Sequence, residues 1–131
     1  MRFRGLFQKK TLPLTGAPAV RRMKTYSAQS GYVYQYYFEG YRPLPVESGV
    51  EFVFQISSDR KEWELVSVYL PDAAVGPWES AQSRQLSSTE RYAIAKMALF
   101  QAFDEREPAK MKDVVHVRQA DLAGILETLD L

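Results

Sequence analysis

The chain has 131 residues, of which 46% are hydrophobic and 25% are charged, and its formal net charge is +1. This length and balance indicate a single folded domain and exclude a disordered chain. The absence of cysteine excludes disulfides, thiolate metal sites and a cysteine nucleophile. The sequence contains no apolar run near the roughly 20 residues that span a bilayer, so we expect a cytoplasmic protein with no membrane partner.

Charge is unevenly distributed along the chain. Residues 39–131 contain all 16 acidic side chains, whereas the charged side chains of residues 1–38 are all basic: Arg2, Arg4, Lys9, Lys10, Arg21, Arg22 and Lys24. A basic segment of this kind can bind nucleic acid or an acidic surface, or it can fold back on an acidic body. We favour the last interpretation, because the two parts attract each other without a third partner.

Helix and strand breakers divide the chain into two parts. Several of them interrupt any periodic pattern before residue 30: Gly5, Pro13, Gly16 and Pro18. We therefore predict a basic arm over residues 1–30, irregular or latch-like, followed by a single α+β domain over residues 31–131.

Three strands are predicted where side chains alternate between two faces, at residues 32–39, 50–57 and 63–70. Short polar links between them predict an antiparallel meander. A fourth, short strand is predicted at residues 113–118, where valines flank the only histidine.

Helices are predicted after the meander. Residues 72–85 indicate a short helix that is interrupted at Gly76–Pro77, because proline suits the first position of a helix. The capping-box pattern Ser87–Glu90 begins a long helix that we expect to end near Glu107. Residues 120–131 form an amphipathic pattern. The predicted order is βββααβα, an α+β fold with the helices mainly on one face of the sheet.

The predicted long helix is apolar around most of its circumference. Its main stripe contains Tyr92, Ala95, Leu99, Ala102 and Phe103. Ile94 and Met97 lie on nearly the opposite side, with Phe100 between the two sides. Such a helix must be covered on more than one side, and a second copy of the chain could supply the cover. We therefore predict a homo-oligomer, as a dimer, with Ile94, Met97 and Phe100 as candidate contacts.

Signals for catalysis are few. A lone histidine in a strand, such as His116, is more often structural or exposed than catalytic. The sequence has no G-x-S-x-G, G-x-x-x-x-G-K-[ST] or G-x-G-x-x-G pattern. We expect no metal and no cofactor, and an enzyme of unknown reaction, using His116 or Lys96, is the third of our hypotheses.

Lys96 stands out on the long helix, because it lies beside Tyr92, Leu99 and Phe103 at helical spacing. Its stem can cover apolar surface while its ammonium group stays in water, which is the interpretation we favour. Alternatively, burial perturbs the amine, or the cation faces an acid on a partner.

The stretch SGYVYQYY, residues 30–37, places three tyrosines on one face of the first strand: Tyr32, Tyr34 and Tyr36. It resembles the aromatic strand motif of RNA-recognition domains, in which aromatic rings stack on bases. It departs from that motif at Ser30, Val33 and Gln35, and the predicted element order differs from the βαββαβ of that fold. The tyrosines are interpreted first as sheet interior or rim, then as a protein interface, then as a stacking platform.

Two functional hypotheses follow. The first is a non-enzymatic interaction module that partners with itself through its aromatic strand and apolar helix. The alternative is a single-stranded nucleic-acid-binding protein, in which Arg21, Arg22 and Lys24 contact phosphates beside the three tyrosines. The general style of the chain is similar to that of small bacterial domains.

Overall fold

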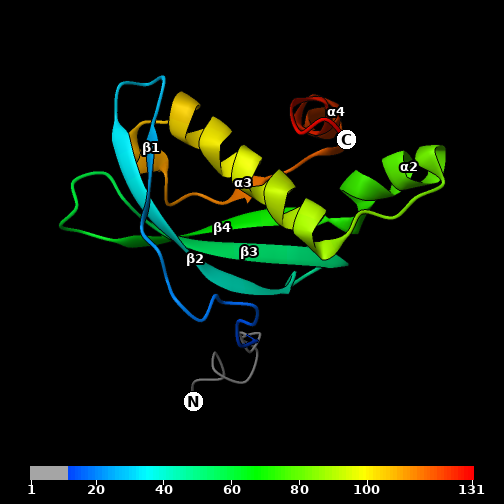
Figure 1. The fold of residues 1–131 in the computed structure, drawn as a ribbon, viewed down its shortest axis with the longest axis horizontal. Helices are drawn as coiled ribbons and strands as arrows, with labels where there is room; N and C mark the ends of the chain where they lie inside the picture. Colours follow the sequence, from blue (N-terminus) through cyan, green and yellow to red (C-terminus); the bar gives the residue numbers. More distant parts are fainter. Residues whose placement is uncertain (1–11) are drawn as a thin grey trace, which may run out of the picture.

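The computed structural model describes residues 12–131 and shows an α+β fold, which confirms the predicted class (Figure 1). Four of the basic positions of the arm, Arg2, Arg4, Lys9 and Lys10, lie outside the described residues. The elements in chain order are β1 (Lys24–Ser27), β2 (Val33–Pro43), β3 (Gly49–Ser57), β4 (Glu64–Pro71), α2 (Asp72–Gln82), α3 (Ser88–Glu105), the 3-10 turn η1 (Pro108–Lys110), β5 (Val115–His116) and α4 (Gln119–Thr128).

The five strands form one sheet in the order β1-β2-β3-β4-β5. Strands β1 to β4 are antiparallel neighbours, so the predicted meander is confirmed, and β5 pairs with β4 in parallel. Strand β1 is an additional edge strand inside the segment that we expected to be irregular or latch-like. Its residues give little sequence signal, because only Tyr26 among them is half-buried and the others are exposed.

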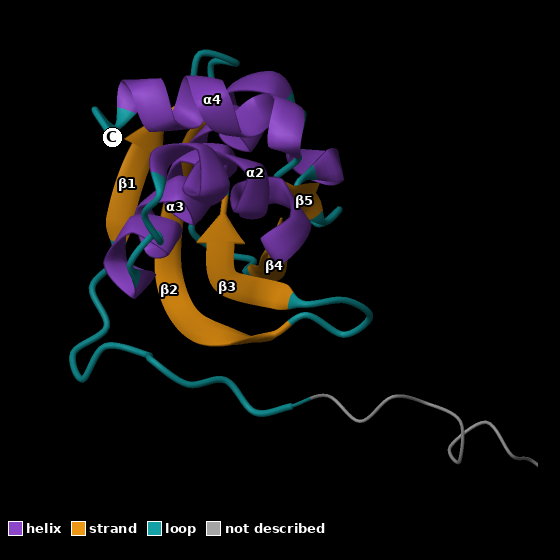
Figure 2. Ribbon diagram, turned by 90° about the vertical axis from the view of Figure 1, so that its right-hand side faces the viewer, coloured by secondary structure: helices purple, strands orange, loops and turns teal. Residues whose placement is uncertain are grey.

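One face of the sheet is covered by the helices, and its inward side chains are part of the core (Figure 2). The predicted alternation is confirmed in β2, β3 and β4, because the inward side chains are buried: Tyr34, Tyr36, Phe52, Phe54, Ile56, Val66, Val68 and Leu70. The sheet is strongly curved, and β2 bends around the helices. This curvature brings β1 beside α3, where Tyr26 stacks on Phe100 with ring centroids 4.3 Å apart.

The bend in β2 coincides with a register shift between Phe38 and Gly40. At this point residues of the arm pair with the strand. Thr15 and Tyr41 exchange two backbone hydrogen bonds of 2.9 and 2.8 Å. Gly40 has φ +125°, and a Cβ atom on it would lie 2.5 Å from the Thr15 carbonyl oxygen. Glycine at this position therefore allows the arm to pack directly on β2.

Helix α2 runs from Asp72 to Gln82 with Pro77 inside it, so the predicted interruption at Gly76–Pro77 is wrong. Proline removes the N–H that would bond to the carbonyl of Ala73. Ala73 and Pro77 are both exposed, and water can satisfy that carbonyl. The helix therefore continues through the proline.

Helix α3 begins at the predicted capping box. The Glu90 N–H donates to Ser87 Oγ at 3.1 Å, and the Ser87 N–H donates to Glu90 Oε1 at 2.8 Å. The helix ends at Glu105, two residues before the predicted end. Among the described helices, none is long and apolar enough to cross a membrane.

Helix α4 packs against both α2 and α3 and buries Leu122, Ile125 and Leu126 in the common core. Ile94, on the side of α3 away from its main stripe, is 0% exposed within a single chain. The second apolar side of α3 is therefore covered from inside the fold. We predicted a homo-oligomer from apolar surface on this side of α3. Ile94 is not part of such a surface, because it is already buried within one chain.

Candidate anion-binding groove

A groove runs along α3, which faces strands β2 and β3 at one end of it and the arm segment of residues 16–24 at the other. It consists of two adjoining cavities of about 290 and 350 Å³, which share Gly16, Phe38 and Tyr92. We call this pair of cavities the α3 groove. The first cavity is also lined by Tyr41, Val50, Phe52, Ser88, Thr89 and Arg91, and the second by Pro18, Val20, Arg22, Lys24, Tyr36 and Lys96.

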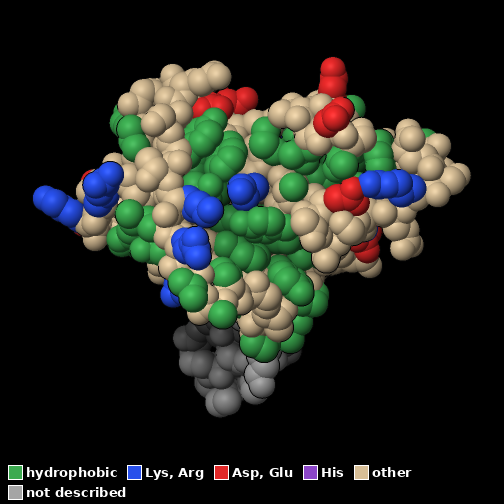
Figure 3. Space-filling view, in the orientation of Figure 1, with side chains coloured by type: hydrophobic (Ala, Val, Ile, Leu, Met, Phe, Trp, Pro, Cys, Tyr) green, Lys and Arg blue, Asp and Glu red, His purple; other side chains and the backbone are tan. Residues whose placement is uncertain are grey.

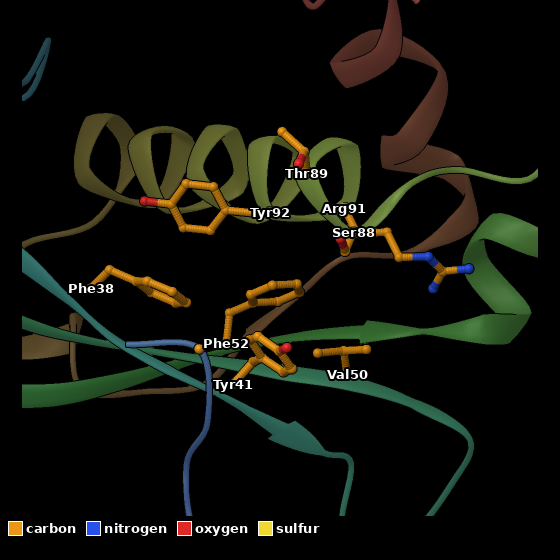
Figure 4. A pocket seen from close by; sticks show the side chains of 9 residues that line it. Phe38, Tyr41, Val50, Phe52, Ser88, Thr89, Arg91 and Tyr92 are labelled. Carbon is orange, nitrogen blue, oxygen red and sulfur yellow. The ribbon is translucent and has the colours of Figure 1, made fainter. Parts of the chain in front are cut away.

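Aromatic rings line the first cavity from the side of α3 and from the side of the sheet (Figure 4). Tyr92 comes from α3, whereas Phe38 and Phe52 come from the inward face of the sheet. The ring centroids of Phe38 and Tyr92 lie 4.7 Å apart, and those of Phe52 and Tyr92 lie 6.3 Å apart. These side chains bring flat apolar surface to the cavity from both layers of the fold.

Three cations line the second cavity: Arg22, Lys24 and Lys96. No acidic residue is among the lining residues, and within the described chain none of the three cations forms an ion pair. In the space-filling view, basic side chains on this side of the molecule are set among hydrophobic ones (Figure 3). The second cavity is therefore positively charged and open to an anion.

Lys96 is half-buried and lies near two aromatic rings. Its Nζ atom is 5.8 Å from the ring centroid of Tyr92 and 5.9 Å from that of Phe100. Cation–π attraction of this kind holds an ammonium group over aromatic faces. Lys96 also lines the second cavity.

The first cavity has a different charge balance. The cation in its lining, Arg91, donates to Asp72 Oδ1 and to Glu79 Oε2, at 3.3 Å in each case. Figure 4 shows the Arg91 side chain directed toward α2, away from the aromatic rings. Arg84 and Glu90 form a further ion pair at this end of α3. The net positive charge of the groove therefore lies in the second cavity.

Two tyrosines of the groove stay neutral in ordinary conditions. Burial, with a smaller contribution from Tyr92, raises the pKa of Tyr36 to about 12. Burial also raises the pKa of Tyr92 above its ordinary value. Since neither hydroxyl becomes a phenolate near neutral pH, neither ring opposes the binding of an anion.

The structure separates the residues of the predicted nucleic-acid surface. Arg22, Lys24 and Tyr36 line the groove, but Arg21 pairs with Glu39 and lies over the Tyr37 ring. Tyr34 is 1% exposed and stacks on Phe103 with centroids 4.1 Å apart, and Tyr36 is 5% exposed. Their rings are packed under α3, so of the three predicted stacking tyrosines only Tyr32, which is 45% exposed, presents its ring to solvent.

The remaining predicted residues lie elsewhere. His116 is exposed on β5, at the sheet edge opposite β1, and its ring meets Tyr69 edge-on at 5.3 Å. Met97 and Phe100 are half-buried and pack against the core. Over residues 12–131, no group of three or more potential metal ligands is found.

Sequence reasoning missed Phe38, Tyr41 and Tyr92 as parts of one site. Their proximity depends on the bend in β2 and on the crossing of the arm at Gly16, where a Cβ atom would lie 2.2 Å from the Tyr41 ring. Two features of the sequence could have indicated the site. One is Gly16, and the other is the spacing of Tyr92 and Lys96, which places both on one face of α3.

Comparison with family models, curated proteins and solved structures finds no significant match.

Proposed function

We propose that the chain is a non-enzymatic interaction module that binds a negatively charged ligand in the α3 groove. The observation that carries this proposal is the convergence of Arg22, Lys24 and Lys96 on one cavity, with no acidic side chain among the described residues of its lining. Ligand sites typically combine apolar walls with a few polar groups that converge, and the groove has this composition.

The physical basis is electrostatic. Three like charges around one cavity repel one another, and a bound anion replaces this repulsion with attraction. Charged hydrogen bonds from lysine or arginine to an anionic oxygen are stronger than neutral ones. The apolar walls strengthen them further by lowering the local dielectric constant.

The lining residues favour binding over catalysis. Ser88 and Thr89 bring hydroxyl groups to the first cavity, but the described lining contains no histidine or carboxylate that could act as a base toward them. His116 lies on β5, outside the groove.

The test is a fluorescence titration of the full chain with anilinonaphthalene sulfonate, an aromatic anion, and with neutral N-phenylnaphthylamine. We expect the anion to bind the folded protein and the Lys24→Gln/Lys96→Gln variant to bind it roughly tenfold more weakly. The matched control is Lys61→Gln/Lys112→Gln, which removes two exposed lysines outside the groove.

Thermal unfolding of each variant verifies that it is folded. Equal dye affinity in the groove variant and in the control variant would contradict the proposal. Equal affinity of the anionic and the neutral dye for the wild-type protein would also contradict it, because the groove would then act only through its apolar walls.

Single-stranded nucleic acid is a second candidate ligand, because Arg22 and Lys24 from the arm stand beside aromatic side chains in the groove. An oligonucleotide would bind with an affinity that falls steeply with salt. Self-association stays a separate prediction, and light scattering of the full chain at high concentration tests it.

A further inference from the structure

We infer that the ligand of the α3 groove is a small amphipathic anion, with one acidic head and an uncharged apolar body. The head lies at Lys24 and Lys96 in the second cavity, and the body extends toward Val50 in the first. This inference rests on the proposed function and adds the class of ligand and its orientation.

The direction of the ligand follows from the difference in charge between the two cavities. The cations of the second cavity have no acidic partner among the described residues, whereas Arg91 in the first is already paired with Asp72 and Glu79. An acidic head in the first cavity would meet a cation whose charge is already balanced. The same head in the second cavity gains the attraction of three cations.

The apolar body fits the lining of the first cavity. Phe38, Tyr41, Val50, Phe52 and Tyr92 line this cavity of about 290 Å³ and present apolar surface to an aliphatic chain or an aryl group. Burying apolar surface against these walls is favourable and increases with the length of the body.

The two cavities adjoin at Gly16, Phe38 and Tyr92, which line both of them. With volumes of about 290 and 350 Å³, they match the lower end of small-molecule sites. A nucleic-acid strand that followed the whole groove would carry phosphates past Glu79, Glu90 and Asp72, which pair with arginines at the far end. A molecule with a single charged end avoids these carboxylates.

The experiment measures displacement of the bound dye from the full-length protein by acetate, hexanoate and decanoate, with hexan-1-ol as the neutral comparison. We expect affinity to rise with chain length, by up to about fourfold for each buried methylene group. Hexan-1-ol should bind about tenfold more weakly than hexanoate. The Lys24→Gln/Lys96→Gln variant should bind each of the three carboxylates more weakly than the wild-type protein does.

A second variant tests the orientation. Ser88→Phe adds bulk at the first cavity, and Ser80→Phe makes the same change at an exposed position of α2, outside the groove. Ser88→Phe should reduce the dependence on chain length and leave acetate binding unchanged, whereas Ser80→Phe should leave both unchanged. If affinity rises equally with chain length in both variants, the inference that the apolar body lies in the first cavity is wrong.

The outcomes separate this inference from the proposed function. Suppose that dye binding depends on Lys24 and Lys96 but decanoate binds no more tightly than acetate. The groove then binds anions, and the inference that its ligand is amphipathic is wrong. If a single-stranded oligonucleotide displaces the dye at concentrations where decanoate does not, the inference is also wrong. If replacing the two lysines does not change the affinity for the dye, the proposed function itself is wrong.

Discussion

Tyr26 on β1 donates its hydroxyl hydrogen bond to the carboxylate of Asp104 on α3, with the hydroxyl oxygen 3.0 and 2.9 Å from the two carboxylate oxygens. The Gln29 N–H donates to the same carboxylate at 2.9 Å. Tyr26 also stacks on Phe100. These contacts fasten the edge strand to the long helix and fix the wall of the groove that carries Lys24.

Replacing Tyr26 with Phe should lower the free energy of unfolding by about 1–2 kcal/mol, because a hydrogen bond to a charged group is lost while the ring stack remains. Urea unfolding measures the change. Tyr32→Phe, at an exposed ring, is the matched control and should have little effect. A Tyr26→Phe protein as stable as the wild type would show that β1 is held without this bond.

Gly40→Ala should destabilise the crossing of the arm over β2. Its φ of +125° disfavours any side chain, and the added Cβ atom would press on the Thr15 carbonyl oxygen. We expect a loss of about 1–3 kcal/mol in unfolding free energy. Limited proteolysis should also cleave the arm faster near Thr15.

Gly124→Ala provides the control for this prediction. Gly124 lies inside α4, and a Cβ atom added there would meet no neighbouring atom within 4 Å, so alanine should stabilise the helix by about 0.5–1 kcal/mol. Similar effects of the two substitutions would contradict the importance of the crossing.

The capping box of α3 should make stability depend on pH in the acidic range. The hydrogen bond from the Ser87 N–H, and then the bond from Arg84, hold the pKa of Glu90 below its ordinary value of 4.5. The unfolded chain therefore takes up this proton first as the pH falls, and the stability from ionised Glu90 is complete above pH 4.5 and lost as pH falls through the lower folded pKa.

Glu90→Gln should thus be less stable than the wild type at pH 7, and the difference should shrink at pH 3. Urea unfolding at both pH values measures this, with Glu105→Gln at the exposed end of α3 as the control. A difference that is the same at both pH values would refute the role of the ionised carboxylate.

Tyr36 should contribute to instability in alkaline solution. Its pKa is raised from 10.0 to about 12, so between these values the unfolded chain releases the proton while the folded protein retains it. Stability therefore falls as pH rises through this window. Tyr36→Phe should reduce that fall by on the order of 1–2 kcal/mol, as measured by urea unfolding from pH 9 to 11.5. An unchanged fall would contradict the burial of the hydroxyl as its cause.

The fold could be predicted from the sequence where local patterns agree with the final packing. Alternation in β2, β3 and β4 placed Tyr34, Phe54 and Val68 on the covered face, and Ser87 and Glu90 marked the start of α3. The interruption predicted at Pro77 was wrong. The free-energy cost of a proline inside a helix depends on whether water reaches the carbonyl that loses its hydrogen bond, and the sequence does not specify this.

The site was less predictable than the fold. Lys96 was placed beside Tyr92 on the long helix, and its Nζ atom lies 5.8 Å from the centroid of that ring. Arg22 and Lys24 were grouped with Tyr36, which lines the second cavity with them. The groove, however, also contains Phe38, Tyr41 and Tyr92, which were not predicted as parts of one site. Its formation depends on long-range contacts, the bend in β2 and the crossing at Gly16, that no short stretch encodes.

The most direct measurement is a nuclear magnetic resonance titration of the isotope-labelled full chain with decanoate, which maps chemical-shift changes by residue. We expect changes concentrated at the groove, in Phe38, Tyr41, Val50, Tyr92 and Lys96, that saturate with one ligand for each chain. Changes concentrated on the opposite face of the sheet, around Glu51 and Tyr69, or no saturable change at any residue, would contradict it.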